Sequence, residues 1–373
     1  MGARRHGAVR TQEKSVRGWH HAPPPGSRSG VADYAERLGH AWSGLDHPGV
    51  DVYHIGNNGL HREIYHRAIE NPGVVILHDA VLHHFLLGTL DRAAYVEEFV
   101  HNYGEWRRDL AGELWDARAS SGVDPRYFEF AMLRRLVERA RGVVVHNPGA
   151  ARIAAAHGAT NVAVVPHFFE AQGLPDACDA ARFRQRLNIE QSTLLFGCFG
   201  YLRETKRLGP TITAFRRLHA IYPDSALLIA GEPVSPILER YLASEARHPA
   251  ILRLGHLAER DLLTAFEAVD CCVNLRYPAA GETSGIAIRL MGIGKPVILT
   301  EGAETEDVPL GACLKVRAGV SESAELFEHM AMLAACPMLG RAIGAEARRH
   351  IATRHSMDAV ARTYAQILRS VSR

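Results

Sequence analysis

The apolar positions of the chain form short continuous runs that alternate with longer amphipathic stretches. Nine such runs predict buried strands, at Val50–Ile55, Gly73–Leu77, Gly142–His146, Val162–Val165, Leu194–Phe199, Ala226–Ala230, Ile251–Leu254, Cys271–Leu275 and Pro296–Leu299. Helical patterns lie between many of them, at Val31–Trp42, His61–Glu70, Ala93–Ala119, Arg126–Ala140, Ala150–His157, Leu208–Ile221, Pro236–Ala246, Glu259–Ala268 and Gly285–Gly292. This alternation predicts an α/β protein whose parallel sheets are covered on both faces.

The length of 373 residues predicts two domains, because a single core stops growing at about 250–300 residues. Residues 168–192 carry glycine, proline and charges without a strand pattern, and we place the domain boundary there. We expect a disordered basic leader over 1–17 and a first Rossmann-like domain over 18–180, with a helical insertion over 90–140. A second Rossmann-like domain over 181–350 follows, then a C-terminal helix over 351–373 that packs back on the first domain. The first domain looks short between Trp42 and Val50, as though a strand and a helix were missing.

The composition limits the possible binding partners of the protein and indicates its cellular compartment. With 43 basic and 41 acidic residues, no overall field of one sign exists to attract nucleic acid or an anionic membrane. No apolar run reaches the roughly 20 residues of a membrane span. Six cysteines without a Cys-x-x-Cys pair favour a reducing cytoplasm. The basic leader lacks the apolar core of a secretory signal, and a transit peptide is the alternative interpretation.

Candidate chemistry follows the strands, because open parallel sheets bind ligands beyond the carboxyl ends of their strands. The loop Gly281-Glu282-Thr283-Ser284-Gly285 opens a helix, and the free N–H groups of a helix start suit phosphate. Glu282 would repel phosphate, but it could accept hydrogen bonds from the hydroxyls of a sugar. The alternative is an ordinary helix start with an acidic first turn.

A second loop follows the strand Leu194–Phe199 and carries Gly200, Arg203 and Lys206. A lysine near a strand end could direct a point charge at a diphosphate. Basic residues at a helix start are usually solvated, so this loop alone is weak evidence for a phosphate site. Together with the loop at Gly281–Gly285, it is stronger evidence. The pair predicts a diphosphate clamp, although the usual Walker A and Gly-x-Gly-x-x-Gly sequences are absent.

In the first half, His78 and Asp79 end one predicted strand, and Asn57 and Asn58 follow another. We regard Asn57, Asn58 and Asp79 as candidate contacts of a sugar or acceptor; the alternative for the asparagines is a turn with a helix cap. Zinc is a second interpretation of the histidines, but a chain with 21 histidines forms local clusters by chance, and we expect no metal. No Gly-x-Ser-x-Gly or His-Glu-x-x-His sequence supports a hydrolase.

These residues resemble a family 4 glycosyltransferase of the GT-B fold, in a bacterial branch, over roughly residues 18–373. The resemblance is strongest between 194 and 300. It rests on Phe199-Gly200-Tyr201-Leu202…Lys206, Gly231, Gly255-His256-Leu257, Gly294-Lys295-Pro296-Val297, Ser29–Tyr34, Leu77-His78-Asp79 and Val164-Val165-Pro166-His167. The resemblance implies two Rossmann-like domains facing across a cleft, a nucleoside diphosphate sugar as the donor, and a hydroxyl acceptor.

The resemblance also assigns roles. Lys206 would bind the donor diphosphate, Glu282 would contact donor-sugar hydroxyls, and His78 would lie near the transferred sugar. Gly30 would face the diphosphate, with Gly200 and Arg203 beside it. The backbone of Thr283, Ser284 and Gly285 would hold phosphate oxygens. No cofactor is implied.

Two departures from the family pattern bear on activity. The family arginine after the first glycine is Tyr201 here, and Arg203 is the candidate replacement. The second family glutamate, which holds the ribose, is replaced by Arg289 or Leu290. Glu301, Glu304 and Glu306 are alternative ribose ligands.

The leading hypothesis is a retaining glycosyltransferase of the hexosyltransferase type, acting in cell-surface polysaccharide biosynthesis. The acceptor could be a glycan, a lipid-linked or a small molecule, and the enzyme cytoplasmic, with peripheral contact at the inner face of the plasma membrane as an option. The alternatives are a catalytically impaired binding or scaffold subunit, and a nucleotide-sugar epimerase, for which the sequence identifies no convincing pair of carboxylates.

Overall fold

Two parallel sheets form the centre of the computed structural model, which describes residues 19–27, 29–42, 49–171 and 173–371. The first sheet has the strand order β1-β2-β3-β4-β5, with β1 at His20–His21, β2 at Val52–Ile55, β3 at Val74–Leu77, β4 at Gly142–Val145 and β5 at Val162–Val164. The second has the order β11-β10-β9-β6-β7-β8, with β6 at Leu194–Phe199, β7 at Ser225–Ala230, β8 at Ile251–Leu254, β9 at Cys271–Asn274, β10 at Val297–Thr300 and β11 at Leu314–Val316. The expected α/β class with two parallel-sheet domains is confirmed.

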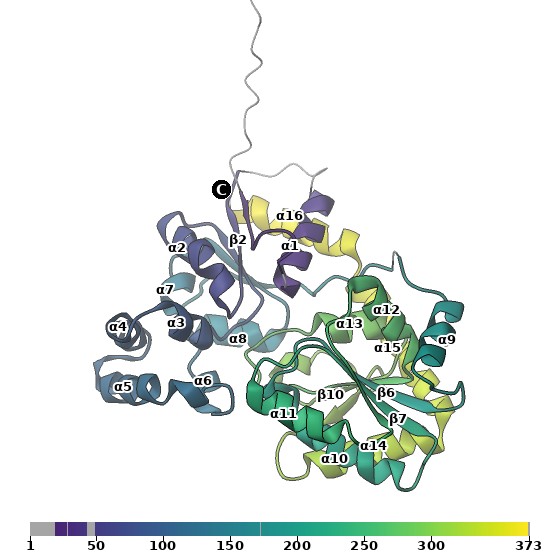
Figure 1. The fold of residues 1–373 in the computed structure, drawn as a ribbon. Helices are drawn as coiled ribbons and strands as arrows, with labels where there is room; N and C mark the ends of the chain where they lie inside the picture. Colours follow the sequence, from purple (N-terminus) through teal and green to yellow (C-terminus); the bar gives the residue numbers. More distant parts are fainter. Residues whose placement is uncertain (1–18, 28, 43–48, 172, 372–373) are drawn as a thin grey trace, which may run out of the picture.

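Helices cover both faces of each sheet (Figure 1). Those before the second sheet are α1 (Gly30–Trp42), α2 (Arg62–Glu70), α3 (His83–Thr89), α4 (Arg92–Tyr103), α5 (Arg108–Asp116), α6 (Arg126–Glu129), α7 (Arg134–Val137), α8 (Pro148–Ala156) and α9 (Ala177–Arg186). Those after β6 are α10 (Leu208–His219), α11 (Pro236–Glu245), α12 (Glu259–Ala268), α13 (Gly285–Gly292), α14 (Glu322–Ala335), α15 (Pro337–Arg354) and α16 (Met357–Val371).

Strand residues alternate between two cores, as the twofold period of a strand requires. In β3, Val75 and Leu77 join a core with α2, α3 and α8, whereas Val74 and Ile76 join a core with α1 and α16. In β9 the adjacent Cys271 and Cys272 enter different cores, because successive side chains of a strand point to opposite faces of the sheet. The inner strands, such as β2, β3, β4 and β9, are therefore buried on both faces, and this explains their continuous apolar runs.

The predicted helix at Ala93–Ala119 is wrong in extent, because α4 ends at Tyr103, just before Gly104, and α5 begins afresh at Arg108. Gly104 has a φ of 93°, a conformation that glycine adopts easily and that ends helices. The predicted helix at Arg126–Ala140 likewise divides into α6 and α7 around Met132, whose φ is 57°.

Several elements escaped the sequence patterns, namely β1, β11, α3, α9, α14 and most of α15. The segment 168–192 contains α9, which the side chain of Asp176 caps by accepting a hydrogen bond from the Asp179 N–H at 2.9 Å. The expected basic leader and the interval that looked short of a strand and a helix lie largely outside the described residues. Within the described ranges, every helix is too short or too polar to cross a bilayer.

Candidate functional site

The strand order of the second sheet places two loops side by side that lie far apart in the sequence. The order reverses between β6 and β9, and such a switch point leaves a crevice at the carboxyl ends of the strands. The loop after β6 carries Lys206, and the loop after β9 carries Arg276 and Glu282. These two loops are the ones that the sequence marked as a diphosphate clamp.

Lys206 lies buried at this crevice, with only 8% of its surface exposed. Its Nζ donates a hydrogen bond to the carbonyl oxygen of Phe199 at 2.6 Å. Burial, helped by the nearby Arg276 charge, lowers the pKa of Lys206 to about 7. An anion bound beside this amine would stabilise its charged form.

The first turn of α13 faces the same crevice. The side chain of Ser284 caps the helix by accepting a hydrogen bond from the Ala287 N–H at 3.3 Å. The Ser284 hydroxyl also donates to Oδ1 of the buried Asn274 at 3.3 Å. The first N–H groups of a helix have no partner within it and carry a partial positive charge, so this turn can hold an anion.

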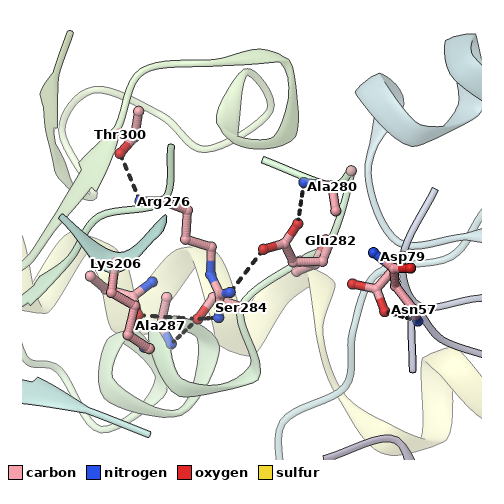
Figure 2. Close-up of polar contacts among 12 residues, drawn as sticks. Asn57, Asp79, Lys206, Arg276, Ala280, Glu282, Ser284, Ala287 and Thr300 are labelled. Carbon is pink, nitrogen blue, oxygen red and sulfur yellow. Dashed lines mark hydrogen bonds and ion pairs between the residues drawn. The ribbon is translucent and has the colours of Figure 1, made fainter. Parts of the chain in front are cut away.

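Glu282 is held by its own loop (Figure 2). One carboxylate oxygen accepts from Arg276 Nη1 at 2.8 Å, and the other accepts from the Ala280 N–H at 2.7 Å. Asp79 of the first domain lies opposite (Figure 2) and accepts a hydrogen bond from the Asn57 N–H at 2.7 Å. Burial and the charge of Glu282 raise the pKa of Asp79 to about 6. The structure thus brings together a carboxylate pair that the sequence did not identify.

His78 ends a chain of buried imidazoles. His78 Nε2 lies 2.9 Å from His54 Nδ1, and His54 Nε2 lies 2.7 Å from His20 Nε2. Burial and the neighbouring histidines lower the pKa of His54 and of His78 well below the usual value. His78 is therefore neutral near pH 7, and a neutral ring can hydrogen-bond a hydroxyl without adding charge.

Two further histidines surround His78, with ring-centre distances of 5.0 Å from His78 to His146 and 5.9 Å from His146 to His167. His146 Nδ1 lies 2.9 Å from the Val165 carbonyl oxygen, which requires the proton on Nδ1. Its buried Nε2 is then an acceptor, with no partner among the described residues. No group of side chains in the described part of the chain has the arrangement of a metal site.

Backbone contacts join the two domains at the Glu282 loop. The N–H groups of Ala80 and Val81 both donate to the Ala280 carbonyl oxygen, at 2.8 and 3.0 Å. Asn147 Nδ2 donates to the Gly281 carbonyl oxygen and to Thr283 Oγ1, each at 3.0 Å. We name these four hydrogen bonds the interdomain clasp.

Three adjoining cavities run along the cleft. The central cavity, of about 380 Å³, is lined by residues that include Gly30, Asn58, His78, Asp79, His146, Gly200, Arg203, Lys206, Arg276, Glu282, Thr283 and Gly285. The outer cavity, of about 340 Å³, shares Gly30, Gly200 and Arg289 with it and reaches Gly231 and His256. The third, which we name the Phe128 cavity, also measures about 340 Å³ and shares Arg276, Glu282 and Thr283 with the central one.

Gly231 lets two loops meet at the floor of the outer cavity. Its φ is 147°, and a Cβ there would lie 2.0 Å from the Gly200 carbonyl oxygen. Only glycine permits this approach, so the glycine noted after the strand in the sequence has a steric reason.

Most of the expected site residues line one of these three cavities. The exception is Asn57. Asn57 does not line any of the three cavities. Its Oδ1 accepts from the Phe85 N–H at 2.8 Å, so its side chain holds α3 in place. Asn58 lines the central cavity and caps the following turn by accepting from the Leu60 N–H at 3.0 Å.

Arg289, one of the two residues that stand where the resemblance expects a second glutamate, lies 3.5 Å from Glu259 in an ion pair. Glu301 and Glu304 line the Phe128 cavity instead of the cavities that contain Arg289. Glu306 pairs with Arg152 at 2.6 Å. The expected alternative ribose ligands therefore lie away from Arg289, while Glu232 and Glu259 line the outer cavity beside it.

Sequence reasoning missed Arg276, Asn147 and His54. Arg276 and Asn147 stand just after strands β9 and β4, where the rule for parallel sheets could have found them. His54 lies within β2, and nothing in its local sequence distinguishes it from a core residue.

The arrangement of the chain is similar to that of solved GT-B glycosyltransferases. Anabaena HepE, whose structure contains UDP-glucose, has a TM-score of 0.60 and 15% identity, covering 86% of this chain and 99% of HepE. WaaG, a glycosyltransferase involved in lipopolysaccharide biosynthesis, has a TM-score of 0.62 and 14% identity, covering 94% and 98%. Sucrose-phosphate synthase from Thermosynechococcus elongatus has a TM-score of 0.60 and 15% identity, covering 90% and 76%.

These similarities establish the GT-B fold. No protein-family model matches the chain, and no curated protein sequence matches it.

Proposed function

We propose that the protein is a retaining glycosyltransferase of family 4, which transfers a sugar from a nucleoside diphosphate to a hydroxyl acceptor. The observation that carries the proposal is the buried Lys206 beside the first turn of α13, in a cavity between the two domains. The GT-B fold supports it, as does HepE, whose structure holds UDP-glucose. We further propose a role in cell-surface polysaccharide synthesis.

In the proposed complex the nucleoside occupies the outer cavity, and the diphosphate and sugar occupy the central one. Gly30 and Gly200 line both cavities, so they border the point where the nucleoside meets the diphosphate. Lys206 and the α13 N–H groups hold the phosphate oxygens, with Arg203 nearby. His78 and Glu282 then face the sugar, with Asp79 beside them.

The chemical step separates a sugar from its diphosphate. As the C1–O bond breaks, negative charge grows on the leaving phosphate, and Lys206 and the α13 dipole are already positioned to stabilise it. The acceptor oxygen forms its bond to C1 on the same face, and its proton passes to the departing phosphate. Glu282 can accept a hydrogen bond from a sugar hydroxyl on a free lone pair while it keeps its contact with Arg276.

A cytoplasmic location with peripheral membrane contact for a lipid-linked acceptor completes the proposal. All six cysteines are free, which is typical of a reducing compartment.

Calorimetric titration with UDP and GDP tests the proposal. Micromolar binding of one nucleotide is expected, and Lys206→Ala should weaken it at least about tenfold, or about 1.4 kcal/mol. Lys315→Ala is the matched control, because Lys315 Nζ also donates to a carbonyl, that of Thr305 at 2.7 Å, but lies outside the cavities. Equal affinities of wild type and Lys206→Ala would contradict the donor site.

A second candidate is a glycosyltransferase-like binding or scaffold subunit. The observation that favours it is Arg289, a cation paired with Glu259 where the family has a ribose-binding carboxylate. Such a subunit need not bind a nucleotide, so the absence of binding to any nucleoside diphosphate would favour it.

A further inference from the structure

The Phe128 cavity has a different chemistry from the rest of the cleft. Its walls come from the end of β10, one side of α13 and the helix α6 of the first domain. Four glutamates and one arginine line it: Glu129, Glu282, Glu301, Glu304 and Arg276. Arg276 is already paired with Glu282. The cavity is therefore acidic, whereas the Lys206 side of the cleft is basic.

Within the described ranges, three of these glutamates have no cation in direct contact, although the charges of Arg152 and Arg317 act on Glu304 and Glu301 from a greater distance. Among the described residues, Glu129, Glu301 and Glu304 form no ion pair. A phosphorylated or carboxylated ligand would be repelled by these carboxylates. Hydroxyl and ammonium groups would instead donate hydrogen bonds to them.

A buried polar group also opens into this cavity. Asn274 is only 5% exposed, and its Oδ1 accepts from Ser284. Its amide nitrogen has no hydrogen-bond partner in the described part of the chain. That nitrogen is not fully enclosed, so it can donate a hydrogen bond to the hydroxyl of a ligand bound in the cavity.

The remaining walls are apolar. Phe128 packs against His84, with ring centres 4.9 Å apart, and lines the cavity together with Ile288 and Met291. An aromatic face can receive the C–H groups of a sugar ring or a cation. The volume of about 340 Å³ falls within the roughly 300–1,000 Å³ of small-molecule sites.

We propose that the Phe128 cavity binds the acceptor, and that the acceptor presents a hydroxyl-rich ring that is neutral or carries an amine, without a phosphate or carboxylate near the reacting hydroxyl. This inference rests on the proposed function, because it assigns the donor to the other two cavities. The Phe128 cavity meets the central cavity at Glu282 and Thr283, so a ring bound there lies next to the donor sugar. The class of acceptor is thereby a neutral sugar, an amino sugar or an aminocyclitol.

Saturation-transfer NMR tests the inference on the full chain with saturating UDP, and with glucosamine, glucose and phosphorylated glucose as probes. At mildly acidic pH, glucosamine should bind most tightly, glucose more weakly, and phosphorylated glucose not at all. Phe128→Ala and Glu301→Lys should each weaken glucosamine binding at least about threefold and leave UDP affinity unchanged. Glu328→Lys is the matched control, because Glu328 is an exposed glutamate of α14 that lines none of the three cavities.

The outcomes separate this inference from the proposed function. If UDP binds but no probe does, or if both variants bind glucosamine as the wild type does, the acceptor site is refuted while the donor site stands. If phosphorylated glucose binds best, the acidic character assigned to the site is wrong. If UDP fails to bind while glucosamine still depends on Phe128 and Glu301, the sugar site stands and the transferase proposal fails.

Discussion

At the residue scale, the clearest feature is the side-chain amine of Lys206, whose pKa is lowered so far that it is only partly protonated near pH 7. Lys206 is nearly buried, and its pKa is lowered to about 7 from the 10.5 of a free lysine. Between these two values the unfolded chain binds more protons than the folded one, so the free energy of unfolding rises with pH over that window. Below pH 7 the full cost of burying the charge is present. A bound diphosphate would compensate that cost.

Nucleotide binding should therefore take up a proton at Lys206. Binding favours the charged amine, so affinity should fall as the pH rises above 7, and about one proton should be absorbed for each UDP bound at pH 8. Calorimetry at pH 8 in two buffers of different ionisation enthalpy measures this uptake. Lys206→Met should bind more weakly and absorb none. The same uptake by both proteins would show that another group titrates.

At the element scale, the first turn of α13 combines stability with anion binding. Ser284 caps the helix and also contacts Asn274 and Arg276. Ser235 caps α11 in the same way, accepting from the Leu238 N–H at 3.1 Å, but lies outside the three cavities. Ser284 lines the Phe128 cavity but not the central one. The two serines therefore separate the cost of losing a cap from the effect of a less ordered first turn of α13 on nucleotide binding.

Ser284→Ala and Ser235→Ala should each lower the free energy of unfolding by about 1 kcal/mol, the usual cost of a lost cap. Only Ser284→Ala should also weaken UDP binding, by about threefold or more. In the proposed complex, only α13 presents its first turn to the phosphates. Urea denaturation and calorimetry measure the two effects. Equal UDP affinities in the two variants would argue against a phosphate site at α13.

At the scale of the whole molecule, several separate contacts join the two domains. The chain passes between them twice at neighbouring positions, where the Phe169 N–H donates to the His355 carbonyl oxygen at 2.7 Å. Beyond that crossing α16 returns to the first domain, and Tyr364 Oη lies 3.0 Å from Tyr34 Oη of α1. Figure 1 shows α16 lying beside α1. The interdomain clasp forms another contact, beside Glu282. Two ion pairs also join the domains, Arg37–Glu259 and Arg152–Glu306.

Asn147→Asp should open the clasp without uncapping α8. The aspartate keeps the cap on the Ala150 N–H, which Asn147 Oδ1 accepts at 2.8 Å, but it cannot donate to Gly281 and Thr283. Two lost hydrogen bonds, each worth about 0.5–1.5 kcal/mol, should speed hydrogen exchange at Ala80 and Val81. The Ala150 amide should stay protected. Unchanged exchange at Ala80 and Val81 would show that Asn147 does not hold the clasp.

The sequence by itself determined most of the strands and helices, the division into two parallel-sheet domains and the loops that carry chemistry. Apolar runs and helical periods are local properties, and parallel strands place their following loops at one edge. Lys206 and Glu282 could be singled out for this reason. The division of 93–119 at Gly104 was not foreseen, because the flanking periodicity continues across it.

Only the tertiary structure decided which of these residues meet. The strand order, which brings β6 beside β9, depends on contacts between distant segments that no local pattern contains. It placed Asp79 opposite Glu282, turned the Asn57 side chain toward α3, and set Glu301 and Glu304 in the Phe128 cavity, away from Arg289. It also lowered the pKa of Lys206, because its burial and the nearby Arg276 arise only when the loops after β6 and β9 pack together.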